Sequence, residues 1–234
     1  MTGILAIETA TDACSVAVCI DGDIRECHEI APRQHSHLLF AMLEELLPGG
    51  DLRGIDVIAY GMGPGSFTGL RIAASAVQGL AYSCGLPAVA VSTLAVLAQT
   101  ALRYRGVEPA DTVLCSIDAR IDEVFSAVYG YEDNRAVLRD GPWACAPADL
   151  APAYPDDLRA VGSGCLFAEQ FPQSLRARIR SCAPGLLPAA RDMFPLALEQ
   201  FRTGKTQAAH NVQPVYVRDE IAWKKLAEQG RTHG

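Results

Sequence analysis

The stretch ILAIETATDACSVAVCIDGDIRECHEI, residues 4–30, holds three strand-like segments joined by short connections. Residues 3–10 form a short apolar run with an acid, Glu8, near its end, and residues 13–20 alternate small and branched side chains. Asp21-Gly22 is a strong hairpin-turn signal, so residues 23–30 can return as a third strand. The stretch therefore predicts one strand followed by a hairpin.

Helices and strands alternate after this hairpin. The sequence predicts a helix over 36–47, a strand over 55–61, a helix over about 68–84, a strand over 87–91 and a helix over about 92–104. The resulting order, βββαβαβα, is typical of a mixed sheet in which the strands after the hairpin run parallel.

The strand–acid–strand–turn–strand pattern occurs again about a hundred residues later. Residues 112–119 form an apolar strand with an acid near its end, and 122–131 and 135–140 follow with a polar turn between them. Beyond 141 prolines punctuate the chain, and the pattern predicts a strand over 158–164, another near 178–182 and a helix near 187–203.

These elements predict an α/β protein with two lobes, each a mixed sheet flanked by helices. We expect the first lobe to span residues 1–105 and the second to span 106–203. The amphiphilic tail, about 204–234, can pack back on the first lobe.

The composition bounds the function. The chain has 234 residues, a formal net charge of −7 and a pI near 5.2, which disfavours a direct grip on nucleic acid. The longest weakly polar run, 86–98, is too short to span a bilayer, so no membrane partner is expected. Eight cysteines without a C-x-x-C pair indicate free thiols in a reducing cytoplasm.

The glycine-rich stretch GMGPGSFTGLRIA, residues 61–73, has the look of a phosphate-binding loop. It lacks the lysine of a Walker A loop, and Ser66 or Thr68 stands where a dinucleotide fingerprint has its third glycine. We therefore expect a tight turn followed by a helix that Ser66 or Thr68 caps.

The two helices that flank this stretch carry more apolar surface than one sheet can cover. On helix 36–47 the apolar side chains fill an arc of about 200°, whereas packing on a sheet needs a little over 100°. Either another part of this chain or another chain covers the excess, and we favour a partner chain. The candidate interface residues are Leu38, Leu39, Met42, Leu43, Leu46, Gly69, Leu70, Ala73, Val77 and Leu80. On this hypothesis Leu43→Glu breaks pairing and leaves the monomer folded, and the same patch forms a homodimer when the partner is absent.

Five motifs together carry a family resemblance. They are ILAIETATDACSVAV, GPGSFTGLRIA, GLPAVAVSTLAVLA, DARIDEVF and PVYVRDE. The chain from residue 1 to about 220 resembles the TsaB family of bacterial tRNA threonylcarbamoyladenosine biosynthesis proteins. The resemblance implies the actin/hexokinase/Hsp70 superfamily, with two ribonuclease H-like lobes.

The resemblance also implies a function. Proteins of this family are non-catalytic subunits required to modify the adenosine beside the tRNA anticodon. They pair with a related metal-containing catalytic subunit, TsaD, through two helices from each chain, and a small ATPase, TsaE, joins them. The matching helices here are 36–47 and 68–84. We expect contact with tRNA only through the assembly.

The metal site of the catalytic relative has no counterpart in this sequence. That relative carries H-x-x-x-H after the strand that follows the glycine loop, and here Thr93 and Leu97 stand at those places. Leucine cannot bind a metal, so we expect no metal, no cofactor and no catalytic residue.

The sequence also departs from the superfamily's nucleotide-binding pattern. Ala10 replaces a glycine in the first phosphate loop, and Ala119 with Arg120 does so in the second, where Arg120 could pair with Asp118 or Glu123. The residues expected to mark what remains of the pocket are Glu8, Thr9, Thr11, Asp12, Asp118, Arg120, Glu123, Gly162 and Gly164.

Alternative readings stay open at the level of sequence. A small-molecule phosphotransferase would use the cleft between the lobes, and a metalloprotease-like hydrolase would need the missing histidines. A direct tRNA-binding module is disfavoured by charge. His35 and His37 favour a surface pair or a helix cap over a metal pair, and acids at strand ends can cap helices instead of catalysing.

Overall fold

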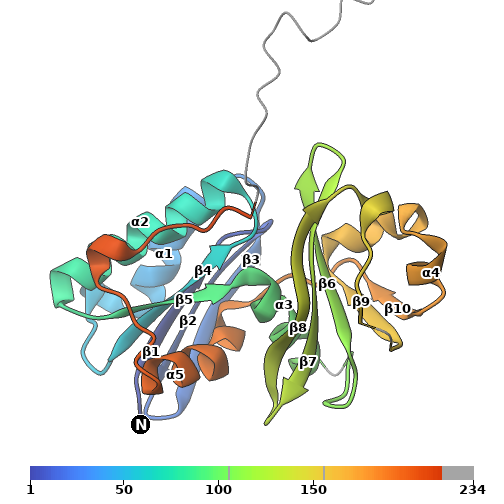
Figure 1. Ribbon diagram of the computed structural model, residues 1–234. Helices are drawn as coiled ribbons and strands as arrows, with labels where there is room; N and C mark the ends of the chain where they lie inside the picture. The colour runs from blue at the N-terminus through green and yellow to red at the C-terminus, as the bar shows by residue number, and fades with distance from the viewer. Residues whose placement is uncertain (105, 155, 218–234) are drawn as a thin grey trace, which may run out of the picture.

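The computed structural model describes residues 1–104, 106–154 and 156–217. These form two five-stranded sheets that stand side by side (Figure 1). The order in the first sheet is β3 (Asp23–Ile30), β2 (Ala13–Ile20), β1 (Ile4–Glu8), β4 (Val57–Gly63) and β5 (Ala88–Ser92). The first three strands are antiparallel neighbours, and β4 and β5 run parallel to β1. The predicted hairpin is confirmed: Asp21 and Gly22, both at positive φ, join β2 to β3.

The second sheet repeats the topology of the first. Its order is β10 (Ile179–Ala183), β9 (Leu158–Val161), β6 (Val113–Arg120), β7 (Glu123–Glu132) and β8 (Arg135–Cys145). The β6–β7 and β7–β8 pairs are antiparallel, and the β6–β9 and β9–β10 pairs are parallel. The predicted repetition is therefore confirmed, and it extends beyond the hairpin to all five strands.

Two long helices cover one face of the first sheet. They are α1 (His35–Leu46) and α2 (Phe67–Cys84), and they pack with β1, β2 and β4 in one hydrophobic cluster (Figure 1). The opposite face is covered by the 3-10 turn η4 (Ala190–Met193) and helix α5 (Phe194–Arg202). The helix predicted over 187–203 is thus a 3-10 turn followed by a nine-residue helix.

The helices do not stay with the sheets of their own half of the chain. Helix α3 (Thr93–Arg103) follows β5, yet Leu94, Leu97 and Ala101 pack in the core of the second sheet. Helix α5 follows β10, yet it packs on the first sheet. A division after residue 105 therefore separates the two sheets but not the two cores.

Shorter elements complete the second lobe. The 3-10 helix η3 (Ser163–Gln170) and the single turn α4 (Gln173–Arg176) cover the other face of its sheet. Further 3-10 turns are η1 (Pro48–Gly50), η2 (Pro147–Asp149) and η5 (Ala209–Asn211). The strand predicted over 158–164 ends at Val161, because Gly162 at φ 95° turns the backbone into η3.

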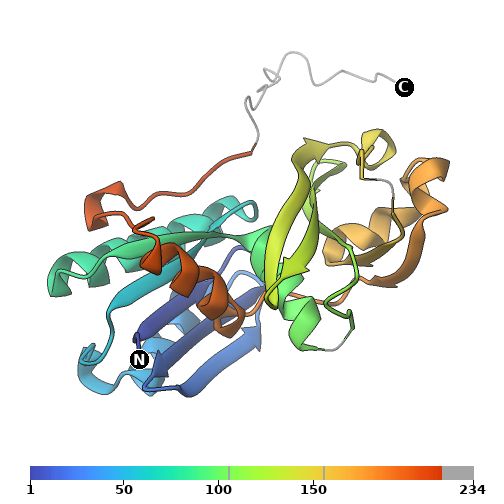
Figure 2. The same cartoon turned by 60° about the horizontal axis from the view of Figure 1, so that its bottom comes forward.

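The described end of the chain, up to residue 217, packs on the first lobe (Figure 2). Gln207 exchanges two backbone hydrogen bonds of 2.9 Å with Ala88, and Val212 is buried in the α1–α2 cluster. Val215 N donates to Met62 O at 2.8 Å, which holds the segment beside α2. Residues 218–234, the rest of the predicted tail, lie outside the described residues. Among the helices that the structure describes, none has the length and apolar character needed to cross a membrane.

Candidate partner-binding groove and interlobe cleft

The glycines before and within α2 make room for the end of β1. A Cβ on Gly61 would lie 2.3 Å from the Glu8 carboxylate, one on Gly65 2.4 Å from Ala10 O, and one on Gly69 1.9 Å from Thr9 O. Thr9 Oγ1 donates to Gly69 O at 2.8 Å, so the two segments are in direct contact. The glycine loop is therefore built for close backbone packing.

Ser66 is the N-cap of α2, which is one of the two caps predicted from the sequence. Its Oγ accepts a hydrogen bond from Gly69 N at 3.3 Å, and the Ser66 backbone N donates to Ala10 O at 2.7 Å. Thr68 instead lies in the first turn and is exposed. The cap fixes where α2 begins relative to β1 and hence which side chains α2 turns outward.

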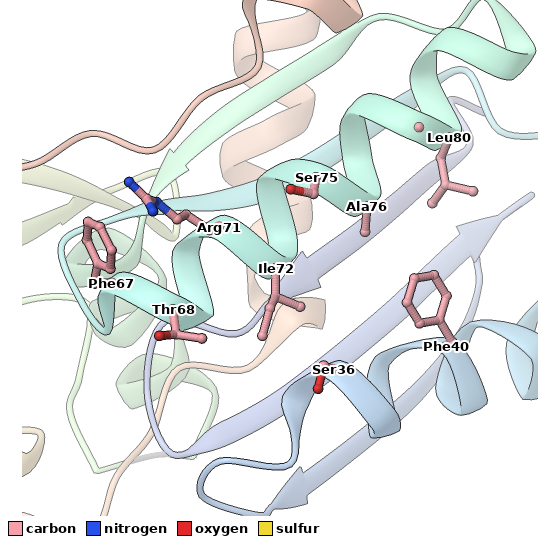
Figure 3. A pocket seen from close by; sticks show the side chains of 10 residues that line it. Ser36, Phe40, Phe67, Thr68, Arg71, Ile72, Ser75, Ala76 and Leu80 are labelled. Atoms are coloured by element: carbon pink, nitrogen blue, oxygen red, sulfur yellow. The ribbon is translucent and has the colours of Figure 1, made fainter.

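A groove of about 690 Å³ runs between α1 and α2 (Figure 3). Its floor and walls are mostly apolar or small, and Phe40 and Phe67 keep 65% and 50% of their surface exposed. Ile72, Ala76 and Leu80 point from α2 toward α1, while Phe40 stands on the α1 side (Figure 3). The lining residues are Ser36, Phe40, Phe67, Thr68, Arg71, Ile72, Ser75, Ala76, Gly79 and Leu80.

Most of the interface residues predicted from sequence lie inside this chain. Eight are buried in the monomer, namely Leu39, Met42, Leu43, Leu46, Gly69, Leu70, Ala73 and Val77. Leu38 and Leu80 are partly buried, and only Leu80 lines the groove. The middle of the apolar face of each helix packs on the sheet. The apolar surface that the sheet leaves uncovered is therefore at the side of each helix, where Phe40 and Ile72 lie. Leu43 is 9% exposed in the core, which corrects the expectation that Leu43→Glu would leave the monomer folded.

A second hollow, of about 1230 Å³, lies between the two lobes. Four of the nine expected pocket residues line it: Thr11, Asp12, Asp118 and Arg120. The other five, Glu8, Thr9, Glu123, Gly162 and Gly164, do not. The groove and the cleft adjoin, because four residues line both of them: Ser36, Phe67, Thr68 and Ile72.

Arg120 is paired within the second phosphate-type loop. Its backbone N donates to Asp118 Oδ1 at 2.7 Å, and its Nη1 lies 3.2 Å from Asp118 Oδ2. Of the two pairings that the sequence allowed, the one with Asp118 is therefore present. Arg120, Ile121 and Asp122 all have positive φ, a conformation that glycine adopts more readily. A phosphate at this loop would compete with the Asp118 carboxylate for Arg120.

Gly162 and Gly164 have a packing role. A Cβ on Gly162 would lie 2.4 Å from Ser116 O, and one on Gly164 would lie 2.1 Å from Ser116 Oγ. Between them, Ser163 Oγ accepts from Asp118 N at 3.0 Å. These glycines let η3 approach β6, and neither glycine reaches the cleft surface.

Glu8 lies buried beneath the first loop. Its Oε1 accepts from Ala10 N at 2.8 Å, and in the described chain its Oε2 has no hydrogen-bond partner. Burial raises the pKa of the Glu8 carboxyl to about 7, although the backbone N–H groups of Ala10 and Thr9 favour the charged form. Glu8 does not line the cleft, whereas Asp12 and Asp118 do.

The histidines at the start of α1 do not form a pair. His35 is buried, and its Nε2 lies 2.8 Å from Thr11 O and 3.2 Å from Ala13 O, whereas His37 is exposed. His35 therefore ties α1 to the β1–β2 loop. Thr93 and Leu97 are both fully buried. Over residues 1–104, 106–154 and 156–217, no group of three or more His, Cys, Asp or Glu side chains is placed to hold a metal.

Several groove residues could not be identified from sequence alone. Phe40 belongs to the apolar arc of helix 36–47 and Ile72 is an apolar residue of helix 68–84, but neither pattern says which edge of the helix faces the sheet. Arg71 was visible as the one charge on helix 68–84, a signal that could have marked it as a surface residue. Tyr216 gave no signal, because only the fold brings the end of the chain to α2.

Comparisons with known proteins agree with this architecture. The family described as TsaD, tRNA N6-adenosine threonylcarbamoyltransferase, matches residues 28–225. The tRNA threonylcarbamoyladenosine biosynthesis protein TsaB of Escherichia coli is 40% identical over 95% of this chain and 97% of its own length. The TsaB protein of Haemophilus influenzae is 32% identical over 95% of this chain and 96% of its own.

A solved structure extends the agreement to three dimensions. YeaZ from Pseudomonas aeruginosa superposes with a TM-score of 0.85 at 37% identity, covering 92% of this chain and all of that one. The two lobes and their repeated sheets are therefore shared along nearly the whole chain. The chain belongs to the TsaB family of tRNA threonylcarbamoyladenosine biosynthesis proteins, within the wider family that TsaD represents.

Proposed function

We propose that this chain is a non-catalytic subunit of an assembly that makes threonylcarbamoyladenosine in tRNA, and that it pairs with a TsaD-type catalytic subunit. The observation that carries the proposal is the groove between α1 and α2. Its apolar side chains are the exposed Phe40 and Phe67 and the partly buried Ile72 and Leu80. They lie in a chain whose relatives along nearly the whole length are named for this pathway.

The groove has the character of a docking surface. Contiguous exposed apolar surface that polar residues surround marks an interaction site. Burying a large apolar side chain contributes about 1.5–3 kcal/mol, so Phe40 and Phe67 could serve as anchors of the pairing. A helix pair from a related chain would fit, because it would meet α1 and α2 with a matching apolar face.

The residues present support a subunit without catalysis of its own. Thr93 and Leu97 stand where the catalytic relatives have metal-binding histidines, and both face the core. Arg120 is engaged by Asp118 in the second phosphate-type loop. The role of this chain would then be to hold its partner in an active arrangement.

The other partners follow from the same proposal. The net charge of −7 favours contact with tRNA through the assembly over a direct grip. A TsaE-type ATPase would join the pair, and without the catalytic subunit the exposed groove would drive weak self-association.

The pairing can be measured by isothermal titration calorimetry with the TsaD-type subunit encoded in the same genome. Phe40→Asp should raise the dissociation constant by about tenfold or more, because it puts a charge into the apolar groove. The matched control is Leu138→Asp, an exposed apolar side chain on β8 that lines neither the groove nor the cleft. If both variants bind as tightly as the unmodified chain, the groove is not the pairing surface.

A further inference from the structure

The groove carries one charged side chain, Arg71. The other nine lining residues are apolar or small and polar, and α2 contains no acid along Phe67–Cys84. Lysine, aspartate and glutamate are depleted from protein interfaces, whereas arginine is enriched there because its planar guanidinium can pair with an acid of the partner. A single arginine on this surface therefore calls for a specific counterpart.

Arg71 is held in place by two aromatic rings. Its guanidinium carbon lies 3.8 Å from the centroid of the Phe67 ring, and its Nε donates to the Tyr216 hydroxyl at 3.2 Å. The rings of Phe67 and Tyr216 are 5.5 Å apart, so the three side chains form one cluster at the end of the groove. Tyr216 is in turn anchored by the neighbouring Val215–Met62 hydrogen bond.

This arrangement leaves the outer edge of the guanidinium for a ligand. The Nε edge is used by Tyr216, and in the described parts of the chain no carboxylate pairs with Arg71. The two Nη groups can bind both oxygens of a carboxylate end-on, which a lysine cannot do. Because the guanidinium is pre-positioned, little conformational freedom would be lost when the carboxylate arrives.

A second copy of this chain cannot supply that carboxylate from its own groove. Its lining contains the same Arg71 and no acid. The acids on α1, Glu44 and Glu45, lie outside the lining, and Glu44 Oε1 accepts from Gly49 N at 3.0 Å. Two grooves packed on each other would therefore desolvate two arginines without an acid between them, which is costly.

We propose that Arg71 is the selectivity residue of the groove: it favours a partner that places a carboxylate against the Phe67–Arg71–Tyr216 cluster and disfavours a second copy of this chain. The inference rests on the proposed function, because it assumes that the groove is the pairing surface. The inference adds that the partner's surface is an apolar helix face that bears one Asp or Glu. It also explains how the groove limits self-association.

Opposite changes in two affinities test the proposal. Arg71→Leu should weaken binding to the TsaD-type subunit by about 10- to 100-fold, because the partner's carboxylate would be buried without a counter-charge. The same change should tighten self-association, measured by sedimentation equilibrium, by about tenfold. Arg71→Lys should weaken heterologous binding less and leave self-association unchanged. An Arg71→Leu variant that weakens both associations, or neither, would overturn the proposal.

A charge exchange identifies the partner's acid. Arg71→Glu should abolish heterologous binding, and one Asp or Glu of the partner, changed to Arg, should restore it. If no acid of the partner's helix pair rescues the variant, Arg71 does not meet a carboxylate. The Phe40→Asp measurement separates the failure of this inference from the failure of the proposed function. If Phe40→Asp weakens binding but the Arg71 variants show no selective effect, the groove is still the pairing surface and only the role of Arg71 is wrong.

Discussion

Among single residues, three glycines explain why the chain has a glycine-rich loop that is built for backbone packing and not for binding phosphate. Gly61, Gly65 and Gly69 each face the segment that ends β1. The number and spacing of glycines could be read from the sequence, but their purpose could not. A phosphate cradle and a close backbone contact require the same residue, and only the position of Thr9 and Ala10 distinguishes the two.

Gly69→Ala should lower the free energy of unfolding by about 1–3 kcal/mol, because the new Cβ would meet the Thr9 carbonyl and force the backbone apart. Gly79→Ala is the matched control on the same helix, since a Cβ there meets nothing within 4 Å. The control should be neutral or gain up to about 1 kcal/mol from better helix propensity. Urea unfolding measures both, and equal effects would contradict the packing role of Gly69.

The buried carboxyl of Glu8 should make stability depend on pH. Its pKa is about 7 in the folded chain and 4.5 in the unfolded chain, so between these values the folded chain binds more protons. The free energy of unfolding should therefore fall as pH rises from 5 to 8, by about 3 kcal/mol in all for this group. Glu8→Gln has no carboxyl to titrate at this position. The free energy of unfolding of this variant, measured with urea, should therefore increase relative to that of the unmodified chain as pH rises from 5 to 8. A constant difference from pH 5 to pH 8 would show that Glu8 is not responsible.

At the scale of elements, the pattern of apolar residues predicts every strand of the first sheet and the helices α1, α2 and α3 to within a few residues. It also predicts that α1 and α2 have surplus apolar surface. It does not predict which edge of the arc is left exposed, because that depends on how each helix is rotated on the sheet. Leu43 therefore lies in the core, and Phe40, three residues earlier, lies in the groove.

Alanine substitutions distinguish the two faces of α1. Leu43→Ala should destabilise the monomer by about 2–5 kcal/mol, because it leaves a cavity in the core. Phe40→Ala should change monomer stability by less than about 1 kcal/mol and weaken pairing with the TsaD-type subunit. Thermal unfolding and titration calorimetry on the same samples report the two effects. The assignment of faces fails if Leu43→Ala is neutral for stability.

At the scale of the whole molecule, the two halves of the chain repeat one topology and exchange helices. Helix α3 completes the core of the second sheet, and η4 and α5 cover the first. The repetition could be predicted from the strand–acid–strand pattern. The exchange could not, because α3 and α5 are apolar enough to pack on either sheet and nothing local selects one. The course of residues 204–217 beside α2 likewise depends on contacts distant in sequence.

An ion pair connects helix α3 to the 3-10 turn η4. Arg103 at the end of α3 binds Asp192 of η4 through two hydrogen bonds of 2.7 and 2.9 Å, and the Asp192 side chain is 6% exposed. Arg103→Leu should cost about 3–5 kcal/mol, because a buried carboxylate loses its counter-charge. The double variant with Asp192→Leu should recover part of that loss in urea unfolding. A double variant no more stable than the single one would argue against the pair.

If this chain activates a TsaD-type transferase through the α1–α2 groove, a reconstituted reaction should depend on both the chain and the groove. The TsaD-type and TsaE-type proteins, the enzyme that makes the threonylcarbamoyl adenylate, threonine, bicarbonate, ATP and unmodified tRNA are mixed with this chain, without it, or with its Phe40→Asp variant. Modified adenosine is counted by mass spectrometry. We expect product only with the unmodified chain, and none from the chain alone. Equal product when the chain is omitted would show that the chain is not a required subunit.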